Sequence, residues 1–204
     1  MKRPERSQLE GEVLQFVPTM EPAVGTLLVA APNLADPNFR RRVLLLCDHN
    51  REGSFGLVIN QPLPMRLGDV VERHRSELLL HQGGPVQEET LHFIHKRADL
   101  ALGSREIGPG LFWGGDFEKA LRLVEKGVMG PADIRFFAGY AGWGKNQIAA
   151  EMRQVSWFVA PVRSEFLFYP LQPGSEDILW KRVLLSLGRR YELLFNYPLD
   201  PSLN

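Results

Sequence analysis

Two apolar runs joined by a short polar connection constrain the fold of this chain most strongly. The first run, RRVLLLCDH, covers residues 41–49, and the second, FGLVINQP, covers residues 55–62. The connection between them, NREGS, has the length of a hairpin turn and is too short for the crossover that joins parallel strands. We therefore expect a β-hairpin here, which argues against a purely parallel sheet.

Helical and strand-like patterns interleave along the rest of the chain. Asp116 is a good N-cap for the helical pattern FEKALRLVEK, which Gly127 ends, and Ser175 precedes a second amphipathic pattern, EDILWKRVLLSL. Short apolar runs predict further strands at GTLLVAAP, TLHFIHKR, DIRFFAGY, SWFVAPV and EFLFYP. We therefore expect an α/β fold of the mixed α+β kind, with a mixed β-sheet covered by helices.

The length of 204 residues fits one domain, or one domain with a smaller lobe. Residues 1–20 are expected to form an N-terminal arm or a short helix, and residues 21–204 a single α/β domain. No apolar run approaches the roughly 18 residues of a membrane helix, and the first residues show no apolar stretch of signal-peptide length. The simplest location is therefore the cytoplasm, without membrane association.

Charge and cysteine content disfavour several classes of function. The chain has 24 basic and 24 acidic residues, so its formal net charge is zero and gives no global field toward nucleic acid. The single cysteine excludes an intrachain disulfide framework and most cysteine-based zinc sites. We expect no cofactor and no metal, because nothing in the spacing of the histidines requires a metal site. The basic clusters are interpreted as solvated charge: Arg40, Arg41, Arg42, Lys181, Arg182, Arg189 and Arg190.

The stretch FFAGYAGWGKNQIAAE, residues 136–151, places three glycines between an apolar run and a helical pattern. A dinucleotide-binding loop needs the order G-x-G-x-x-G, whereas this stretch has G-x-x-G-x-G. A phosphate loop needs a hydroxyl residue after its lysine, whereas Asn146 follows Lys145. We interpret the stretch as a tight strand-to-helix junction in which Trp143 fills the core, with an anion or small ligand at the helix N-terminus as the alternative.

Cys47 and His49 are the candidate catalytic residues. Because neighbouring residues of a strand point to opposite faces, we expect both side chains on one face, where a cysteine–histidine pair is sterically possible. A cysteine that ends an apolar run such as VLLLC is more often a small buried hydrophobic residue, and we favour that interpretation.

Polar side chains and bare backbone also gather at predicted strand ends. Asn60 precedes a turn locked by Pro62, and Gly83 and Gly84 form another turn that is fixed by Pro85. Such groups are the usual components of ligand pockets in α/β proteins. Together with the glycine stretch, they give the predicted ligand-binding residues: Asn60, Gly83, Gly84, Pro85, Gly139, Tyr140, Gly142, Trp143 and Gly144.

Five separated stretches carry motifs in a recognisable order. They are GTLLVAAPNLADPNFRRRVLLLCDHNREGSFGLVINQPL (25–63), QGGPV (82–86), GLFWGGD (110–116), RFFAGYAGWGKNQIAAEM (135–152) and ILWKRVLLSLG (178–188). Together they resemble the bacterial YqgE/AlgH family. The resemblance implies a compact mixed-sheet α/β domain with a smaller intertwined subdomain, located in the bacterial cytosol. The family is largely uncharacterised and is sometimes labelled a transcriptional regulator, and it provides no established catalytic residue to transfer.

One motif departs from the family pattern. Where the family usually has Gly-Gln-Leu-Glu, this chain has Asn146, Gln147, Ile148 and Ala149, so the glycine and the acid are missing. The missing acid weakens any mechanism that depends on a carboxylate at that position.

The sequence favours a non-enzymatic ligand-binding or regulatory protein, because glycines, an amide and aromatic residues cluster without a nucleophile–base–orienter set. The alternatives are an enzyme, either a hydrolase or a thiol-dependent catalyst, that uses Cys47 and His49, and a direct transcriptional regulator. The expected partner is a small molecule or anion, or a protein, with nucleic acid disfavoured. The chain is expected to be a monomer or a weak homo-oligomer.

Overall fold

In the computed structural model, residues 20–34 and 36–196 are described, and they contain one ten-stranded sheet. Its main path runs in the order β10-β1-β2-β3-β9-β6-β8-β7, and β5 joins β9 and β4 beside this path. The strands are β1 (Thr26–Ala30), β2 (Val43–His49), β3 (Gly53–Val58), β4 (Pro62–Arg66), β5 (Leu79–Gln82), β6 (Val86–His95), β7 (Arg105–Gly108), β8 (Leu111–Trp113), β9 (Ile134–Gly144) and β10 (Trp157–Pro161).

Helices cover parts of this sheet. The α-helices are α2 (Leu67–Val70), α3 (Phe117–Glu125), α4 (Gln147–Arg153), α5 (Ser164–Leu167) and α6 (Glu176–Ser186), and two 3₁₀-helices are η1 (Ala98–Leu100) and η2 (Arg189–Asn196). All strand pairs are antiparallel except β5 with β9. The expected mixed α+β fold is therefore confirmed.

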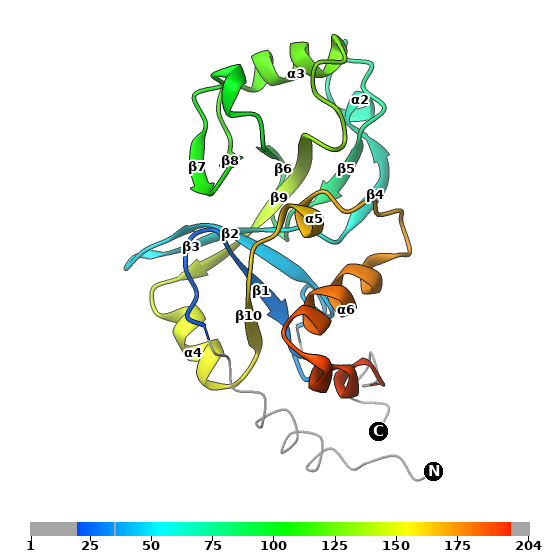
Figure 1. The fold of residues 1–204 in the computed structure, drawn as a ribbon. Coiled ribbons are helices and arrows are strands. Elements are labelled where there is room, and N and C mark those ends of the chain that lie inside the picture. Colours follow the sequence, from blue (N-terminus) through cyan, green and yellow to red (C-terminus); the bar gives the residue numbers. More distant parts are fainter. Residues whose placement is uncertain (1–19, 35, 197–204) are drawn as a thin grey trace.

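The long strand β9 connects the two halves of the molecule (Figure 1). Its last residues, 141–144, pair with β3, whereas its first residues, 134–140, pair with β5 and β6. Figure 1 shows α2 and α3 on the half that contains β4–β8, and α4 and α6 on the half that contains β1–β3 and β10. β9 thus joins the two halves through its pairing with β3 on one side and with β5 and β6 on the other.

The alternation of side chains along β1 and β2 builds two cores on opposite faces of the sheet. Leu27, Val29 and Leu45 face α6, whose Trp180 is fully buried and donates its indole N–H to the carbonyl of Ala30 at 2.8 Å. The opposite face packs under α4 and contains Leu28, Leu44, Leu46, Trp143, Ile148 and Trp157. A third core lies beneath α3 in the other half.

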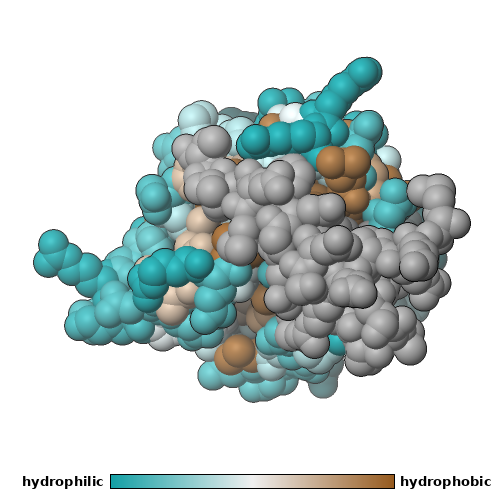
Figure 2. All heavy atoms as spheres, turned by 90° about the horizontal axis from the view of Figure 1, so that it is seen from below, coloured by the Kyte–Doolittle hydropathy of each residue, from teal (hydrophilic) through white to brown (hydrophobic). Residues whose placement is uncertain are grey.

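The outer surface agrees with this segregation of side chains. On the face shown in Figure 2, hydrophilic residues cover most of the described part, and hydrophobic residues form small areas. Among the described residues, no helix is long and apolar enough to cross a membrane.

Several predicted elements are confirmed. β2 and β3 form the expected hairpin, with Leu44 opposite Val58 and His49 opposite Ser54. Asp116 caps α3 by accepting a hydrogen bond from the backbone N–H of Lys119 at 2.9 Å, and α6 follows Ser175 as expected. Of the expected arm at residues 1–20, only residue 20 is described, so the division into an arm and a single domain at 21–204 stays a prediction.

Two predicted elements are wrong. The run EFLFYP was expected to be a strand, but its first half belongs to α5, where the consecutive residues Phe166 and Leu167 are both buried in the core under α6. Consecutive burial suits a helical turn, whereas a strand with one exposed face buries alternate residues. The glycine stretch was expected to form a junction after its strand, but β9 continues through it to Gly144, because residues 141–144 pair with β3.

Gly139 lets β9 pass the turn between β5 and β6 at very short range. It has a φ of +65°, and a Cβ at this position would lie 2.6 Å from the carbonyl oxygen of Gly84 and 2.9 Å from that of Val86. Gly83 and Gly84 approach β9 just as closely from the other side of this contact. A Cβ on Gly83 would overlap the backbone of Gly139, and a Cβ on Gly84 would overlap the backbone of Tyr140. The predicted double-glycine turn and the predicted glycine stretch therefore meet as a backbone crossing, which we call the glycine crossing.

Replacing Gly139 by alanine is expected to destabilise the protein through two effects. The positive φ alone costs about 1–3 kcal/mol for a residue with a Cβ, and the overlap with the Gly84 carbonyl adds at least about 1 kcal/mol. Gly103→Ala is the matched control, because Gly103 has a similar φ of +69° with nothing within 4 Å of the added Cβ. Urea unfolding should show the larger loss for Gly139→Ala, and equal losses would contradict the crossing.

Candidate functional site

The predicted ligand-binding residue Asn60 is used inside the fold. Its side chain is fully buried, and its Oδ1 accepts a hydrogen bond from the backbone N–H of Val43 at 2.8 Å. Its Nδ2 donates to the carbonyls of Arg41 at 2.9 Å and Glu176 at 2.8 Å. Asn60 thereby joins the start of β2 to the start of α6, and both of its side-chain polar atoms are engaged.

The predicted glycines lie in three places. Gly83, Gly84 and Gly139 belong to the glycine crossing, where the approaching backbones fill the space that a ligand would need. Gly142 pairs with Phe55 in the β3–β9 ladder, and Gly144 lines a cavity of about 160 Å³ together with His49. The predicted glycines therefore do not form one pocket.

Trp143 fills the core between the sheet and α4, as the sequence suggested. Its indole N–H donates to the Glu151 carboxylate at 3.1 Å, and the indole of Trp157 donates to the same oxygen at 2.6 Å. Asn146, which stands where the family usually has glycine, has a φ of +60°, a conformation that asparagine tolerates better than most residues. Its side chain makes no capping hydrogen bond to α4.

The candidate catalytic residues Cys47 and His49 lie in different surroundings. β2 carries a β-bulge between Leu46 and Asp48, so the simple alternation that placed both side chains on one face is wrong. Cys47 is buried in the core under α6, while His49 lines a cavity of about 420 Å³ with Ile148 and Met152 of α4. His49 shares a hydrogen bond of 2.7 Å between its Nδ1 and the Ser54 hydroxyl.

The surroundings of Cys47 oppose thiolate chemistry. Its side chain is fully buried, and this burial raises the pKa of the thiol well above its usual range. Since the thiolate is the nucleophile, the thiol-dependent alternative finds no support at this position.

We expect Cys47 to resist modification by an aromatic disulfide reagent in the native state. Because it is the single cysteine, the absorbance of the released thiolate reports on this residue alone. The reaction should be at least about 100-fold slower in buffer than in denaturant, where the thiol becomes accessible. Rapid modification of the folded protein would restore Cys47 as a candidate nucleophile.

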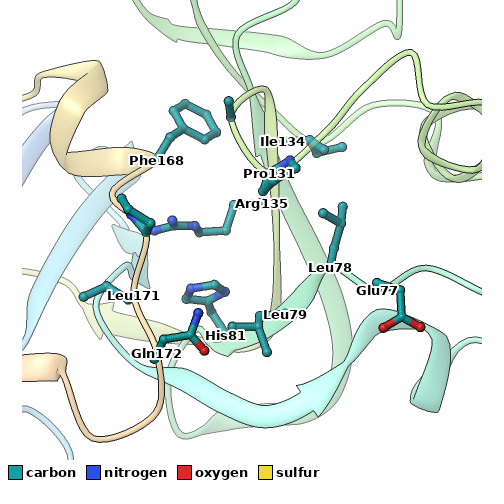
Figure 3. A pocket seen from close by; sticks show the side chains of 12 residues that line it. Glu77, Leu78, Leu79, His81, Pro131, Ile134, Arg135, Phe168, Leu171 and Gln172 are labelled. Atoms are coloured by element: carbon teal, nitrogen blue, oxygen red, sulfur yellow. The ribbon is translucent and has the colours of Figure 1, made fainter.

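A different pair of polar residues faces a cavity between the sheet and the segment that links α5 to α6 (Figure 3). His81 of β5 and Arg135 of β9 extend into this cavity, which has a volume of about 530 Å³. The other residues that line it are mainly apolar: Glu77, Leu78, Leu79, Pro131, Ala132, Ile134, Phe168, Pro170, Leu171 and Gln172. A volume of this size suits a small-molecule ligand.

Local sequence explains why the two polar side chains meet here. Along β5, Leu80 packs into the core beneath α3, so Leu79 and His81 face the other way, into the cavity. Along β9, Phe136 likewise joins the core beneath α3, and Arg135 and Phe137 lie on the opposite face. The parallel register of β5 with β9 sets His81 beside Phe137.

Arg135 is buried, yet its side-chain hydrogen bonds to the described residues go to backbone carbonyls. Its Nη1 donates to the carbonyl of Ile59 at 3.2 Å and its Nη2 to that of Tyr169 at 2.6 Å. Burial lowers the pKa of Arg135 to about 10, so the guanidinium remains charged at neutral pH. In the part of the chain that the structure describes, no carboxylate forms an ion pair with it.

His81 is 4% exposed, and neither of its ring nitrogens has a hydrogen-bond partner among the described residues. Burial lowers the pKa of His81 to about 3, and the positive charge of Arg135 adds to this shift. The backbone of Leu79 acts in the opposite direction and raises the pKa, although it forms no hydrogen bond of normal geometry with the ring. The imidazole is therefore neutral at physiological pH. It has one donor and one acceptor that no described residue engages.

Sequence reasoning placed neither residue in a ligand site. A signal was present in both cases, since Arg135 interrupts the apolar run IRFF and His81 directly follows the apolar run LLL. A charged or polar residue within a buried strand needs a hydrogen-bond partner or a counter-ion. Among the described residues, Arg135 has only uncharged partners and His81 has none.

The fold and the cavity define a mixed α+β protein with a ligand-sized, mainly apolar site between its sheet and a helix connection. The AlgH-like family, DUF179, matches residues 27–192, and the chain therefore belongs to this family, as the sequence motifs indicated.

Its relatives share most of their length with it. A UPF0301 protein from Chlorobium luteolum is 43% identical over 183 residues, which cover 89% of this chain and 95% of that protein. A UPF0301 protein from Cytophaga hutchinsonii is 39% identical over 183 residues, which cover 88% of this chain and 98% of that protein. The names of these relatives specify neither a ligand nor a reaction.

Two solved structures are similar to this fold. The crystal structure of protein DIP2367 from Corynebacterium diphtheriae has a TM-score of 0.69 at 26% identity and covers 87% of this chain and 94% of its own. The solution structure of AlgH from Pseudomonas aeruginosa has a TM-score of 0.66 at 27% identity and covers 97% of this chain and 98% of its own.

The lowered pKa of His81 predicts a dependence of stability on pH. In the unfolded chain His81 takes up a proton near pH 6.5, whereas in the folded protein it does so only near pH 3. As the pH falls between these values, the unfolded state binds more protons, so stability falls by up to about 1.4 kcal/mol per pH unit from this residue.

Urea unfolding of the wild type and of His81→Phe between pH 7.5 and 4.5 checks this dependence. Burial also lowers the pKa of His92 and His95, and these residues contribute equally in both proteins. The variant should therefore lose less stability on acidification, and identical slopes would show that His81 is protonated in the folded state.

Proposed function

We propose that this protein is a non-enzymatic binding protein that holds a small molecule in the cavity at His81 and Arg135, and that occupancy of the cavity is its regulatory signal. One observation carries the proposal: His81 is buried beside a ligand-sized cavity, and neither of its ring nitrogens has a partner in the described part of the chain. Buried polar groups in native proteins are nearly always hydrogen-bonded, because leaving them unpaired costs about 1–3 kcal/mol. A ligand that pairs with the imidazole removes this cost.

The lining of the cavity supports binding more than catalysis. The described residues that line it include no serine, threonine, cysteine or lysine as a nucleophile. His81 is a weak base, since its lowered pKa lies far from neutral pH. Glu77 is exposed at the rim and pairs with Arg66, so it is poorly placed to act as an orienting carboxylate.

The cavity also replaces the strand-end turns as the proposed place of binding. Asn60 and the glycine crossing have structural partners that satisfy them, whereas His81 has none among the described residues. The cavities beside His49 differ in this respect, because the His49 Nδ1 already pairs with Ser54.

A metabolite panel followed by thermal shift tests this function, with two tryptophan variants as controls. Leu79→Trp fills the proposed cavity from a half-buried position on β5, and Ala149→Trp places the same side chain in the cavities beside His49. A true ligand at 100 times its dissociation constant should stabilise the wild type by about 2.7 kcal/mol.

The stabilisation should persist in Ala149→Trp and disappear in Leu79→Trp. The proposal fails if no compound in the panel stabilises the wild type. It also fails if Leu79→Trp responds to the ligand as strongly as the wild type does.

A further inference from the structure

We propose that the ligand is an amphipathic monocarboxylate whose carboxylate binds Arg135 and His81 and whose apolar body lies against the hydrophobic walls of the cavity. This inference rests on the proposed function and adds the chemical class of the ligand. It follows from the charge, the free donors and the lining of the cavity, taken in turn.

The first argument is the uncompensated charge of Arg135. The guanidinium has five N–H donors, and its two described bonds go to the uncharged carbonyls of Ile59 and Tyr169. The carboxylate that lines the cavity, Glu77, has a side chain that is 80% exposed and forms an ion pair with Arg66. A buried charge without a counter-ion is unfavourable, so an anion that enters the cavity gains the full attraction of the guanidinium.

The second argument is the proximity of His81. The register of β5 with β9 places His81 beside Phe137, two residues from Arg135 on the same face, and the positive charge of Arg135 contributes to the lowered pKa of His81. Figure 3 shows both of them directed into the same cavity. A neutral imidazole donates one N–H, so the pair provides a charged fork and one further donor for an oxygen-rich head group.

The balance of charge selects a monoanion. With His81 neutral and Glu77 already paired, the net charge that the cavity offers is that of one guanidinium. A carboxylate balances this charge and matches the planar fork of arginine. A dianionic phosphate would leave one negative charge unbalanced in a mainly apolar space, which is unfavourable.

The remaining lining selects an apolar body. Leu79, Phe168 and Leu171 line the cavity beside the two polar groups, and the volume of about 530 Å³ exceeds what a carboxylate head alone would fill. Burial of each additional methylene group against such walls contributes about 0.8 kcal/mol. Small hydrophilic acids are therefore poor candidates, and aliphatic or aromatic monocarboxylates are good ones.

Three probes with eight carbon atoms each test the head group: octanoate, 1-octanol and octyl phosphate. Calorimetric titration at pH 7.5 should show octanoate binding at least 10-fold more tightly than 1-octanol and more tightly than octyl phosphate. Leu79→Trp should abolish octanoate binding, and Ala149→Trp should preserve it. Arg135→Lys should reduce the preference for octanoate over 1-octanol, because lysine keeps the charge and loses the planar fork.

A second readout needs no variant at Arg135, which also holds the Tyr169 carbonyl in place. Nitrogen-15 NMR of the histidine rings, with the His81 signals assigned by their absence in His81→Phe, should show one His81 nitrogen becoming a hydrogen-bonded donor on addition of octanoate. 1-Octanol should leave the signals closer to those of the free protein.

The outcomes separate the two proposals. Equal affinities for octanoate and 1-octanol, both lost in Leu79→Trp, would overturn the anionic head group and leave the binding function intact. Tighter binding of octyl phosphate than of octanoate would overturn the monocarboxylate. Octanoate binding that is unchanged in Leu79→Trp would also overturn the inference, since the site would lie elsewhere. Failure of these probes together with the whole metabolite panel would remove the proposed function itself.

Discussion

The close passage of β9 across the turn between β5 and β6 is the constraint on which the rest of this structure depends. β9 pairs with β3 at one end and with β5 and β6 at the other, so a single strand carries the hydrogen bonds of both halves. The backbone of Gly83 is held on both sides, since its N–H donates to Ala138 at 2.7 Å and its carbonyl accepts from Val58 at 2.8 Å. A side chain at Gly139 would separate these strands, and the cavity that β5 and β9 line would lose its shape.

The cavity follows from this arrangement and from one hydrogen bond. Because the register of β5 with β9 aligns Leu80 with Phe136, and both pack beneath α3, His81 and Arg135 lie together on the opposite face of the sheet. The segment after α5 closes this side, and Arg135 holds it there by donating to the Tyr169 carbonyl at 2.6 Å. The same guanidinium thus supports one wall of the cavity and supplies its positive charge. A ligand that bonds to Arg135 is in this way linked to the segment that leads into α6.

Local sequence signals predicted the elements whose neighbours lie close in the chain. The β2–β3 hairpin and the capped helix α3 depend on turn length, hydrophobic spacing and a single N-cap, all of which are visible in the sequence. The bulge beside Cys47 was not predictable, because it arises from the pairing of β2 with β3 rather than from a local pattern. The extension of β9 through Gly144 likewise depends on a distant partner strand.

The candidate site was missed for a related reason. His81 and Arg135 lie 54 positions apart and meet because β5 pairs with β9, and single-sequence patterns do not contain that pairing. The glycines stood out in the sequence because several of them lie close together. In the fold, Gly83, Gly84 and Gly139 allow two backbone segments to approach each other, and this contact also has no local signature in the sequence. At position 146, where the resemblance predicts glycine, Asn146 has a φ of +60°, which asparagine and glycine both tolerate.

Stability alone accounts for Arg135 but not for His81. The guanidinium bridges Ile59 and Tyr169 and so ties two parts of the fold together, which offsets part of the cost of burying its charge. His81 makes no such bond within the described residues, and a phenylalanine or leucine there would fill the same space without an unpaired polar atom. A buried imidazole that weakens the folded state and faces a cavity is best understood through what enters that cavity. The neighbouring charge of Arg135 indicates the chemical group that enters. A carboxylate has one negative charge and accepts several hydrogen bonds, so it can pair with Arg135 and His81 at the same time.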